Sequence, residues 1–319
     1  MNISIIIPIK AKPGDKIINF ANYILCLSNE LKNYECEIII ADESEDEVSS
    51  VLSKMFKKAC NIKHFIPETS VRIGANDKLN GVYAALNYCK YDKVLLLDDH
   101  YRLTISTLEK VNNYYDVFDC FKMMPKFHNT PLSVLVDLCG MFVINVLDYR
   151  KQYCGHLAFR KSQYDKVGFP SRDALFDEFA MEKHLRINGY NIGFVKDVSL
   201  EAIQDITFIK FLEQRVRYAY ENLAIPSRFF LYAIVIPITI LLGLININYS
   251  VMFAAAITSF IILIAFIGQI LYGMSIAPFY TFLFSPVWFW FYPFTTWISI
   301  YKYFKGGVMF GGRKIKRAS

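Results

Sequence analysis

Two pairs of adjacent carboxylates could take part in catalysis. Asp98 and Asp99 follow a short apolar run and lead directly into His100, so oxygen and nitrogen donors meet at one point of the chain. Such donors hold Mg²⁺ or Mn²⁺, and a divalent cation can bridge a protein to a diphosphate. The alternative is a charged, solvated turn, and the triplet alone is a weak signal.

The second pair, Asp177 and Glu178, opens a stretch of helical character that ends near Gly189. A helix N-terminus keeps carboxylates ionised, which suits a general base that deprotonates an acceptor hydroxyl. Acidic residues are also common in the first turn of a helix, so capping alone would explain the pair.

Cationic and aromatic residues could complete such a site. Gln214, Arg215, Arg217 and Tyr218 precede a long apolar stretch. A guanidinium group can clamp a diphosphate through two N–H groups, and an aromatic ring can stack on a sugar or an acceptor. The alternative is the positive flank of a membrane span. Lys78 and Asn80 precede the first carboxylate pair and could bind phosphate or be exposed helix residues.

Alternating apolar runs and amphipathic segments predict the elements that position these residues. The expected strands are residues 3–7, 37–41, 62–66 and 93–97, and the expected helices between them are residues 15–32, 47–59 and 77–88. Short, nearly all-apolar runs are typical of parallel strands covered on both faces. The alternation predicts an α/β fold with a doubly wound, mostly parallel sheet.

Ligands bind to such sheets outside the carboxyl ends of the strands. Asp42 follows the second apolar run and Asp98 follows the fourth, so both are expected at that edge, and Pro8 is expected to end the first strand there. Two carboxylates that both follow strands of one sheet are explained equally well by a shared binding site and by two separate solvated turns.

The composition divides the chain near residue 226. The chain is 54% apolar, and the excess over a soluble protein lies after Ser227. Phe229 to Ile245 and Val251 to Tyr272 are expected to span a membrane. Residues 277–303 contain three prolines and many aromatic residues, which suits an interfacial or re-entrant segment. We therefore expect a globular domain of residues 1–226 and a membrane anchor of residues 227–319.

Charge and cysteine usage favour a cytoplasmic domain on a membrane. The net charge of +6 is concentrated in a basic C-terminal cluster, which indicates a membrane surface and not a nucleic acid as the partner. Basic flanks lie on the cytoplasmic side, so an integral membrane protein with an even number of crossings, two, is expected. The seven cysteines form no CxxC pair and no secretory signal precedes them, so reduced thiols are expected.

Six segments, taken in order, resemble the family-two glycosyltransferases of the GT-A fold, and more narrowly the ceramide glucosyltransferases. They are Ile-Ile-Ile-Pro8, Ala41-Asp42-Glu43-Ser44, Gly74-Ala-Asn-Asp-Lys78-Leu-Asn80, Leu97-Asp98-Asp99-His100, Asp177-Glu178-Phe-Ala-Met-Glu-Lys183 and Gln214-Arg-Val-Arg217-Tyr218. The resemblance covers residues 3 to 220, and Gly311-Gly312-Arg313 is similar to the family's tail after the membrane segment.

The resemblance implies an inverting hexosyltransferase that uses a nucleoside-diphosphate sugar, first of all a UDP-sugar, with Mn²⁺ or Mg²⁺ and a lipid hydroxyl as acceptor. The resemblance implies that the donor is bound by Pro8, Asp42, Lys78, Asn80, Asp98 and Asp99, with Asp42 at the nucleobase. It implies that Asp98 and His100 bind the metal and that Glu178 or Asp177 is the base. It also implies a diphosphate and acceptor site formed by Gln214, Arg217 and Tyr218.

Three departures from the family's motifs leave alternatives open. His100 stands where the family usually has Asp, which favours a softer ligand set such as one for Mn²⁺. The order Asp177-Glu178 is the reverse of the usual one, and Tyr218 replaces a Trp. The other interpretations are a polysaccharide synthase, a polyprenyl-phosphate glycosyltransferase and an inactive, membrane-tethered protein that binds nucleotide sugars. Of the histidines outside these motifs, His156 beside Gly155 is the one to test.

Overall fold

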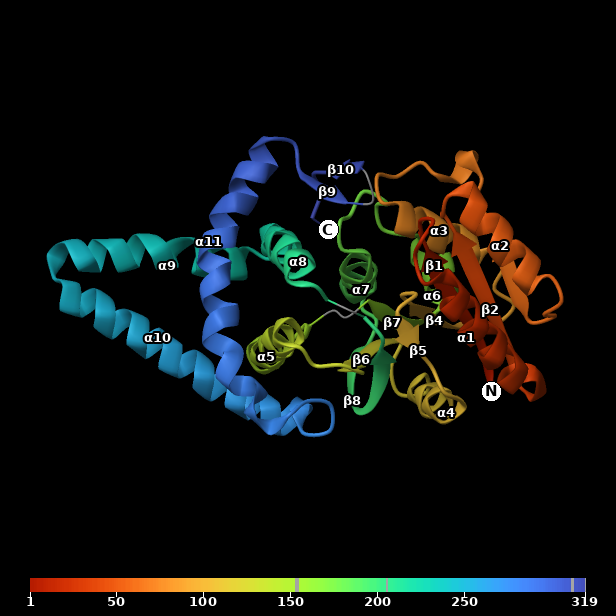
Figure 1. Cartoon of the computed structure of the whole chain (residues 1–319), viewed down its shortest axis with the longest axis horizontal. Coiled ribbons are helices and arrows are strands. Elements are labelled where there is room, and N and C mark those ends of the chain that lie inside the picture. Colours follow the sequence, from red (N-terminus) through yellow and green to blue (C-terminus); the bar gives the residue numbers. More distant parts are fainter. Residues whose placement is uncertain (153–154, 205, 311–312, 319) are drawn as a thin grey trace. The chain divides into compact units, whose positions relative to one another are not determined.

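The chain forms two compact units in the computed structural model, which describes all residues except 153–154, 205, 311–312 and 319 (Figure 1). The first unit comprises Met1–Pro125 and Tyr153–Ala202, and the second comprises Lys126–Gln152 and Ile203–Ser319. Cys154, which is one of the seven cysteines, and Gly311 and Gly312 of the tail lie outside the described residues. The six described cysteines are all free thiols.

An eight-stranded sheet with the order β3-β2-β1-β4-β7-β6-β8-β5 organises the first unit. Its strands are β1 (Asn2–Ile9), β2 (Glu35–Asp42), β3 (Ile62–Phe65), β4 (Lys93–Leu97), β5 (Tyr101–Arg102), β6 (Cys120–Phe127), β7 (His156–Arg160) and β8 (Ile192–Ala202). β3, β2, β1 and β4 are mutually parallel, whereas β7 pairs antiparallel with both β4 and β6, and β5 pairs antiparallel with β8.

The parallel half and the helices between its strands confirm the predicted α/β architecture. The helices of this unit are α1 (Ile17–Glu30), α2 (Asp46–Phe56), α3 (Asp77–Leu86), α4 (Ile105–Tyr114), α6 (Lys161–Val167) and α7 (Asp177–Ile187), with short 3-10 turns η1 (Leu31–Asn33) and η2 (Thr69–Val71). Residues of β1, β2 and β4 are buried on both faces, which explains their nearly continuous apolar sequences.

The expectation that Pro8 ends the first strand is wrong. Pro8 lies inside β1 and is in register with Ala41 of β2, and the strand continues to Ile9. β1 pairs with β4 only as far as Ile6. At Pro8 one side of β1 therefore has no strand partner, and a residue without a backbone N–H is tolerated at such an edge.

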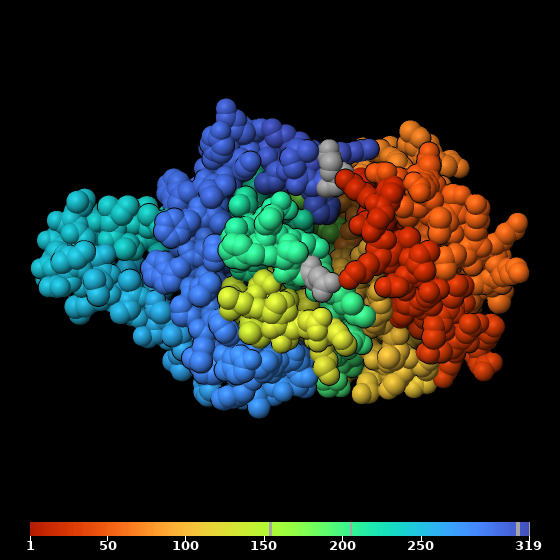
Figure 2. Space-filling model, in the orientation of Figure 1, coloured from red at the N-terminus to blue at the C-terminus, as the bar shows by residue number. Residues whose placement is uncertain are grey.

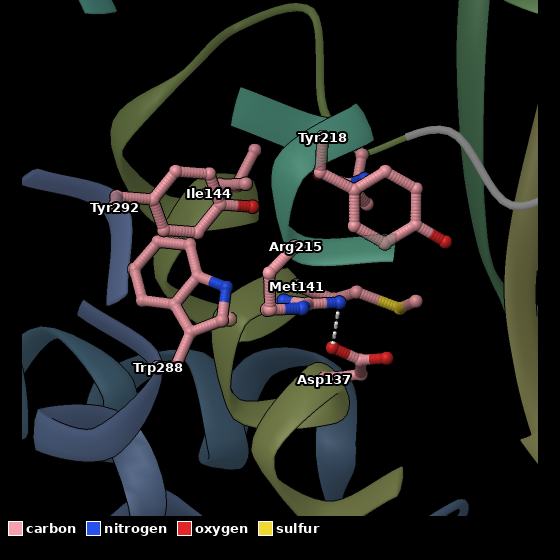
Figure 3. Close-up of a pocket in the computed structure, with 9 residues that line it drawn as sticks. Asp137, Met141, Ile144, Arg215, Tyr218, Trp288 and Tyr292 are labelled. Carbon is pink, nitrogen blue, oxygen red and sulfur yellow. Dashed lines mark ion pairs between the residues drawn. The ribbon is translucent and has the colours of Figure 1, made fainter. Parts of the chain in front are cut away.

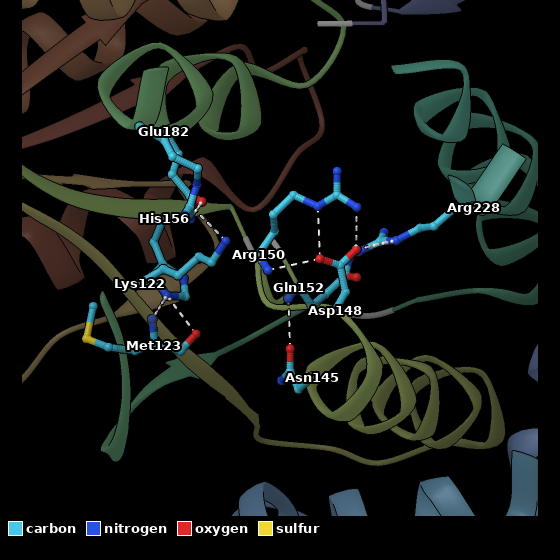
Figure 4. A network of polar contacts seen from close by, with 10 residues as sticks. Lys122, Met123, Asn145, Asp148, Arg150, Gln152, His156, Glu182 and Arg228 are labelled. Carbon is cyan, nitrogen blue, oxygen red and sulfur yellow. Dashed lines mark hydrogen bonds and ion pairs between the residues drawn. The ribbon is translucent and has the colours of Figure 1, made fainter. Parts of the chain in front are cut away.

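A buried polar network joins the antiparallel strands to α7. Lys122 Nζ lies 2.6 Å from Glu182 Oε2, with both side chains almost fully buried, and Arg186 Nη2 lies 2.6 Å from the other oxygen, Oε1. The ring of His156 is completely buried, and its Nε2 lies 3.0 Å from the backbone N of Met123 (Figure 4). His156 therefore holds β7 to β6 and is not exposed to a ligand.

The second unit is helical. Its elements are α5 (Leu132–Leu147), α8 (Phe208–Glu221), η3 (Asn222–Ala224), α9 (Pro226–Ile245), α10 (Ile247–Gly268), the π-helical turn η4 (Gln269–Gly273), η5 (Phe279–Phe284), α11 (Ser285–Phe304) and a hairpin of β9 (Val308–Phe310) and β10 (Arg313–Ile315). α5 packs on α10 and α11. A Cβ added at Gly268 would lie 2.5 Å from the carbonyl oxygen of Phe142, so α10 approaches α5 as closely as only glycine allows.

Two helices of this unit are long and apolar enough to cross a membrane, Pro226–Ile245 and Ile247–Gly273. Few of their side chains are buried, and Figure 2 shows them projecting beyond the other helices of the second unit. They coincide with the two stretches predicted as spans. The third apolar stretch forms η5 and α11, and its interfacial or re-entrant placement stays a prediction.

The compact units differ from the division at residue 226. α5 and α8 precede that residue, yet both belong to the second unit. The physical reason is visible in α5, which carries one charged residue, Asp137, among sixteen and is buried against α10 and α11. A helix of this length is too short for a membrane span, so hydropathy does not separate α5 from the globular domain.

Candidate active site

Three carboxylates converge on one lysine beyond the carboxyl end of β4. Lys78 Nζ lies 2.6 Å from each of Asp98 Oδ1, Asp177 Oδ2 and Glu178 Oε1. Asp98 directly follows β4, Lys78 lies in the first turn of α3, and the other two carboxylates open α7. Asp98 lies at the carboxyl end of β4, where the sequence predicts it, and the predicted helix start that carries Asp177 and Glu178 meets it there.

The start of α3 is fixed by two asparagines. Asn76 caps the helix by accepting a hydrogen bond from the backbone N of Leu79, and its Nδ2 donates to the carbonyl of Ala174 at 2.7 Å. Asn80 accepts from the N of Gly74 through Oδ1 and donates to its carbonyl through Nδ2, and its side chain is fully buried. In this structure Asn80 holds the loop before α3, and Asn76 ties it to the loop before α7.

The lysine and the carboxylates set one another's protonation. Burial alone would lower the pKa of Lys78, but the charges of Asp177, Asp98 and Glu178 raise it well above its ordinary value. Burial, and then the charge of Glu178, raise the pKa of Asp177 to about 8. Burial would also raise the pKa of Glu178, but the charge of Lys78 and hydrogen bonds from Lys78, the backbone and Asp177 hold it below its usual value.

The two adjacent carboxyls of α7 therefore differ at neutral pH. Asp177 keeps its proton and donates a hydrogen bond, whereas Glu178 is ionised beside the Lys78 ammonium. Two carboxyls whose surroundings separate their pKa values in this way can divide acid and base roles between them.

Gly155 gives Asp98 its position. Its backbone has φ +75°, and a Cβ added there would lie 2.4 Å from Asp98 Oδ2, while its carbonyl accepts a hydrogen bond from the N of Asp98 at 3.0 Å. A side chain at residue 155 would therefore displace the carboxylate that contacts Lys78.

We expect Gly155→Ala to lower activity and stability together, because the methyl group strains the backbone and pushes Asp98 from Lys78. The matched control is Gly189→Ala: Gly189 also has a positive φ, +84°, but no atom lies within 4 Å of its added Cβ. Both variants should lose about 1–2 kcal/mol to backbone strain, and Gly155→Ala a further ~1–3 kcal/mol to the clash. Denaturant unfolding measures the stability of each variant, and the rate of donor hydrolysis measures its activity. Equal effects of Gly155→Ala and Gly189→Ala would contradict the role of Gly155 in positioning Asp98.

Asp99 and His100 lie beside this cluster and are partly exposed. His100 Nδ1 is 3.6 Å from Asp99 Oδ1, and Asp98 adjoins them with one oxygen on Lys78. Two ligands of one cation lie about 3 Å apart when each is about 2.1 Å from it, so Asp99 Oδ1 and His100 Nδ1, at 3.6 Å, lie near the separation that a shared divalent ion requires. Among the described residues no group of three His, Cys, Asp or Glu side chains forms a complete metal cage.

Asp42 lies at the end of β2 with its side chain fully buried. Its Oδ1 accepts a hydrogen bond from the N of Ser44 at 2.9 Å, and its Oδ2 lies 2.8 Å from His64 Nε2. These hydrogen bonds outweigh the effect of burial and lower the pKa of Asp42. His64 therefore positions this carboxylate.

Gln214, Arg217 and Tyr218 belong to α8 in the second unit. Gln214 is buried, and Arg217 lies 4.7 Å from the ring centre of Phe310. Tyr218 lines a pocket of this unit together with Trp288 and Tyr292.

An ion pair that the sequence did not reveal lies in this pocket. Arg215 pairs with Asp137 of α5, and both are buried; the ring of Tyr218 lies to one side of the pair and the rings of Trp288 and Tyr292 to the other (Figure 3). Burial raises the pKa of Asp137 to about 6, although Arg215 opposes the rise. Arg215 and Arg217 are two residues apart and so point to different sides of α8.

Comparison with known proteins shows the fold. No protein-family model and no curated protein matches the chain. The solved structure of the mannosyltransferase PcManGT from Pyrobaculum calidifontis, in complex with GDP-Man and Mn²⁺, matches with a TM-score of 0.51 and 14% identity over 97% of this chain and 76% of that chain. The chain has the GT-A fold.

A second solved structure, S. aureus TarS 1–349 in complex with UDP-GlcNAc, matches with a TM-score of 0.48 and 16% identity over 98% of this chain and 95% of that chain. The chain spans 40% of the length of the longer TarS structure. The GT-A fold confirms the predicted fold class, and the individual site residues stay predictions.

Proposed function

We propose that the chain is a membrane-bound glycosyltransferase that moves a hexose from a nucleoside-diphosphate sugar, a UDP-sugar first of all, to a lipid hydroxyl with inversion. The observation that carries the proposal is the cluster of Lys78 with Asp98, Asp177 and Glu178 at the ligand-binding edge of a GT-A sheet. Such a cluster combines an ionised base with neighbouring carboxylates at the place where this sheet type binds its ligands.

Glu178 serves as the base in this proposal. It is ionised at neutral pH because Lys78 lies 2.6 Å away, and Asp177 supports it with a hydrogen bond. Glu178 Oε takes the proton of the acceptor hydroxyl as the oxygen attacks the anomeric carbon. Lys78 holds the carboxylate in place and stabilises its charge until that transfer.

A divalent cation fits beside the base. Asp98 and His100, with Asp99 between them, would hold it, and when bound it would neutralise the charge of the leaving diphosphate. The donor set supports Mn²⁺ or Mg²⁺, because one imidazole nitrogen joins carboxylate oxygens. The candidates for binding the donor nucleotide remain Pro8, Asp42, Lys78 and Asn80. Asp42 and Asn80 would contribute to donor binding by holding their loops in place.

The second unit supports a lipid as the acceptor. Its two apolar helices suit an integral membrane protein with a cytoplasmic catalytic domain, and the same unit holds the pocket of Tyr218, Trp288 and Tyr292 around Arg215. Aromatic faces beside a buried charged pair suit a polar headgroup. The presence of two candidate spans favours a lipid acceptor over a polysaccharide synthase, because a synthase needs more spans to form a channel. The Gln214 to Tyr218 segment favours a lipid hydroxyl acceptor over a polyprenyl phosphate.

We expect the purified chain with Mn²⁺ and a panel of UDP- and GDP-sugars to release nucleoside diphosphate, at least slowly, and chelation of the metal to stop the release. His100→Ala should raise the Mn²⁺ concentration for half-maximal release by about tenfold or more, whereas His128→Ala, an exposed histidine of the other unit, should not change it. A folded chain that releases no nucleotide from any donor would favour the inactive binding protein instead.

A further inference from the structure

The second unit carries a long uncharged segment with an exposed apolar surface. Residues 229–301 contain no Asp, Glu, Lys or Arg. Within it, none of residues 236–260, all of which the structure describes, is buried; they form the hairpin between the middle of α9 and the middle of α10. Leu244, Ile245 and Ile247 at its tip are 65–81% exposed. An exposed apolar surface of this extent indicates contact with a membrane or with another protein.

The tip of the hairpin closes through its own polar groups. The side chain of Asn246 accepts a hydrogen bond from the backbone N of Asn248, and the backbone N of Asn246 donates to the carbonyl of Leu242, both at 2.9 Å. Ser250 Oγ donates to the carbonyl of Thr239 at 3.0 Å. A chain reversal that meets its backbone hydrogen bonds internally can enter hydrocarbon, where no water is present to replace them.

The helix α11 crosses the hairpin at one level. Trp290 Nε1 donates to Thr258 Oγ1 of α10 at 3.0 Å, and the ring of Tyr292 stacks on that of Tyr232 of α9 at 4.8 Å. Thr258 lies twelve residues after Asn246 and Tyr232 lies fourteen before it, which at about 1.5 Å per residue are about 18 and 21 Å. Figure 1 shows α11 running across the hairpin, which therefore projects about 20 Å beyond it.

The polarity of α11 is the inverse of that of a helix in a water-soluble protein. Its buried side include hydroxyl residues, whereas its exposed side is mainly aromatic and apolar. The buried hydroxyl residues are Ser285, Thr295, Thr296 and Ser299, and the exposed face comprises Phe294, Trp297, Ile298, Tyr301 and Phe304. Trp290, Phe294, Trp297 and Tyr301 follow at the spacing of one helix face. The exposed face therefore continues the face of α11 that contacts α10.

Two lysines adjoin the exposed face at the end of α11. Lys302 and Lys305 are exposed, and Lys305 Nζ lies 5.9 Å from the ring centre of Tyr301. Tryptophan and tyrosine together with lysine are typical of the boundary between a membrane and water.

The two depths that the hairpin could take put different groups in hydrocarbon. If the hairpin crossed a core of about 30 Å with its tip at the far surface, α11 would lie about 20 Å from that surface, inside the core. Lys302 and Lys305 would then lie in hydrocarbon. So would the Asp137–Arg215 pair, which lines a pocket together with Trp288 of α11. Charged side chains at that depth are costly. With α11 at the near surface, only the uncharged hairpin enters the core.

We propose that the α9–α10 hairpin enters one leaflet of a lipid bilayer and leaves it on the same side, and that α11 lies along the membrane surface with its exposed aromatic face among the headgroups. The inference deepens the proposed membrane attachment and rests on it, but it does not rest on the transferase reaction. Trp288 of α11 would place the pocket that it lines at the depth of the headgroups. The hydroxyl of a lipid acceptor lies at that depth.

The fluorescence of the chain can report this depth, because its three tryptophans, Trp288, Trp290 and Trp297, all lie in α11. The full chain is reconstituted in phosphatidylcholine vesicles that carry a nitroxide either on the headgroup or near the end of the acyl chain. The difference between the wild type and Trp297→Phe isolates the quenching of Trp297. Adding Tyr249→Trp to Trp297→Phe reports the tip in the same way. Trp297 and Tyr249 are both exposed, so neither substitution removes a packed side chain.

We expect the headgroup nitroxide to quench Trp297 more strongly than the acyl-chain nitroxide does. The opposite order is expected at position 249, which lies about 14 Å beyond the contact of Thr258 with α11. A hairpin that crossed the whole bilayer would reverse both orders, and reversed or equal orders at the two positions would overturn the proposal. Quenching of neither position by either lipid would overturn membrane insertion itself. Nucleotide release from a donor sugar is measured separately, so an inactive chain with the expected quenching would leave this inference standing.

Discussion

Glu178→Gln is expected to lower the transfer rate by about 10²–10⁴-fold, the usual contribution of a general base. The amide keeps the shape of the side chain and can still lie near Lys78, but it cannot take a proton. Donor affinity should stay nearly unchanged, because the variant removes one charge and no bulk. Transfer is measured with saturating donor, and donor binding is measured by calorimetry with the same nucleotide sugar.

Asp177→Asn distinguishes the two carboxyls. Because burial and Glu178 raise the pKa of Asp177 to about 8, it carries a proton at neutral pH, and an amide N–H can replace its O–H as the donor to Glu178. We therefore expect Asp177→Asn to keep most of the activity at pH 7. Above pH 8 the wild type gains a negative charge at Asp177 that repels the diphosphate, so its donor affinity should fall there, and that of Asp177→Asn should not.

Glu47→Gln, in the first turn of α2 and exposed, is the control for the loss of a helix-opening glutamate. If Asp177→Asn abolished transfer while Glu178→Gln kept it, the base would be Asp177, and the assignment of the ionised partner to Glu178 would be wrong.

Lys78→Met is expected to destabilise the chain by about 3–5 kcal/mol at neutral pH, because it leaves buried carboxylates without their counter-charge. Lys10→Met is the matched control: Lys10 Nζ also lies 2.7 Å from an aspartate, Asp77, but the pair is exposed at the lysine, so the loss should be about 0–1 kcal/mol. Denaturant unfolding of both variants against the wild type measures the difference.

The defect of Lys78→Met should depend on pH. Without the ammonium, Asp98, Asp177 and Glu178 are more stable protonated, so the folded variant binds more protons than the wild type and its relative stability rises as the pH falls. The recovery should extend downward from about pH 8, where the pKa of Asp177 already lies, towards about pH 4, the ordinary range of carboxyl groups. A loss that is the same at pH 5 and pH 8 would show that Lys78 acts through packing and not charge.

Three strands of the parallel half, β1, β2 and β4, could be predicted because each contains a short apolar run buried on both faces. The antiparallel half could not. β5 has two residues, β6 interrupts its apolar pattern with Lys122, Pro125 and Lys126, and β8 alternates on only part of its length. β6 takes its place by pairing with β7, and β5 takes its place by pairing with β8. Pairing partners far apart in the sequence leave no local signal.

The sequence predicts most residues of the candidate site but not that Lys78 lies at its centre. Carboxylates after buried strands and at a helix start are visible in a sequence, whereas the central place of Lys78 depends on residues up to 100 positions away. Asn80 and Asp42 were expected to bind the donor, and their burial comes from tertiary contacts with Gly74 and His64. The partner of Arg215 lies in α5, so only the packing of α5 on α8 distinguishes Arg215 from Arg217.

The order of the segments along the chain limits how one unit can be expressed without the other. Residues 126–152 interrupt the first unit in sequence and belong to the second. A fragment that stops at residue 226 would carry α5 without α10 and α11, and would leave Phe142 and its apolar neighbours in water. A water-soluble version of this protein therefore requires the loop around α5 to be replaced as well as the tail removed, since no single truncation point separates the two units.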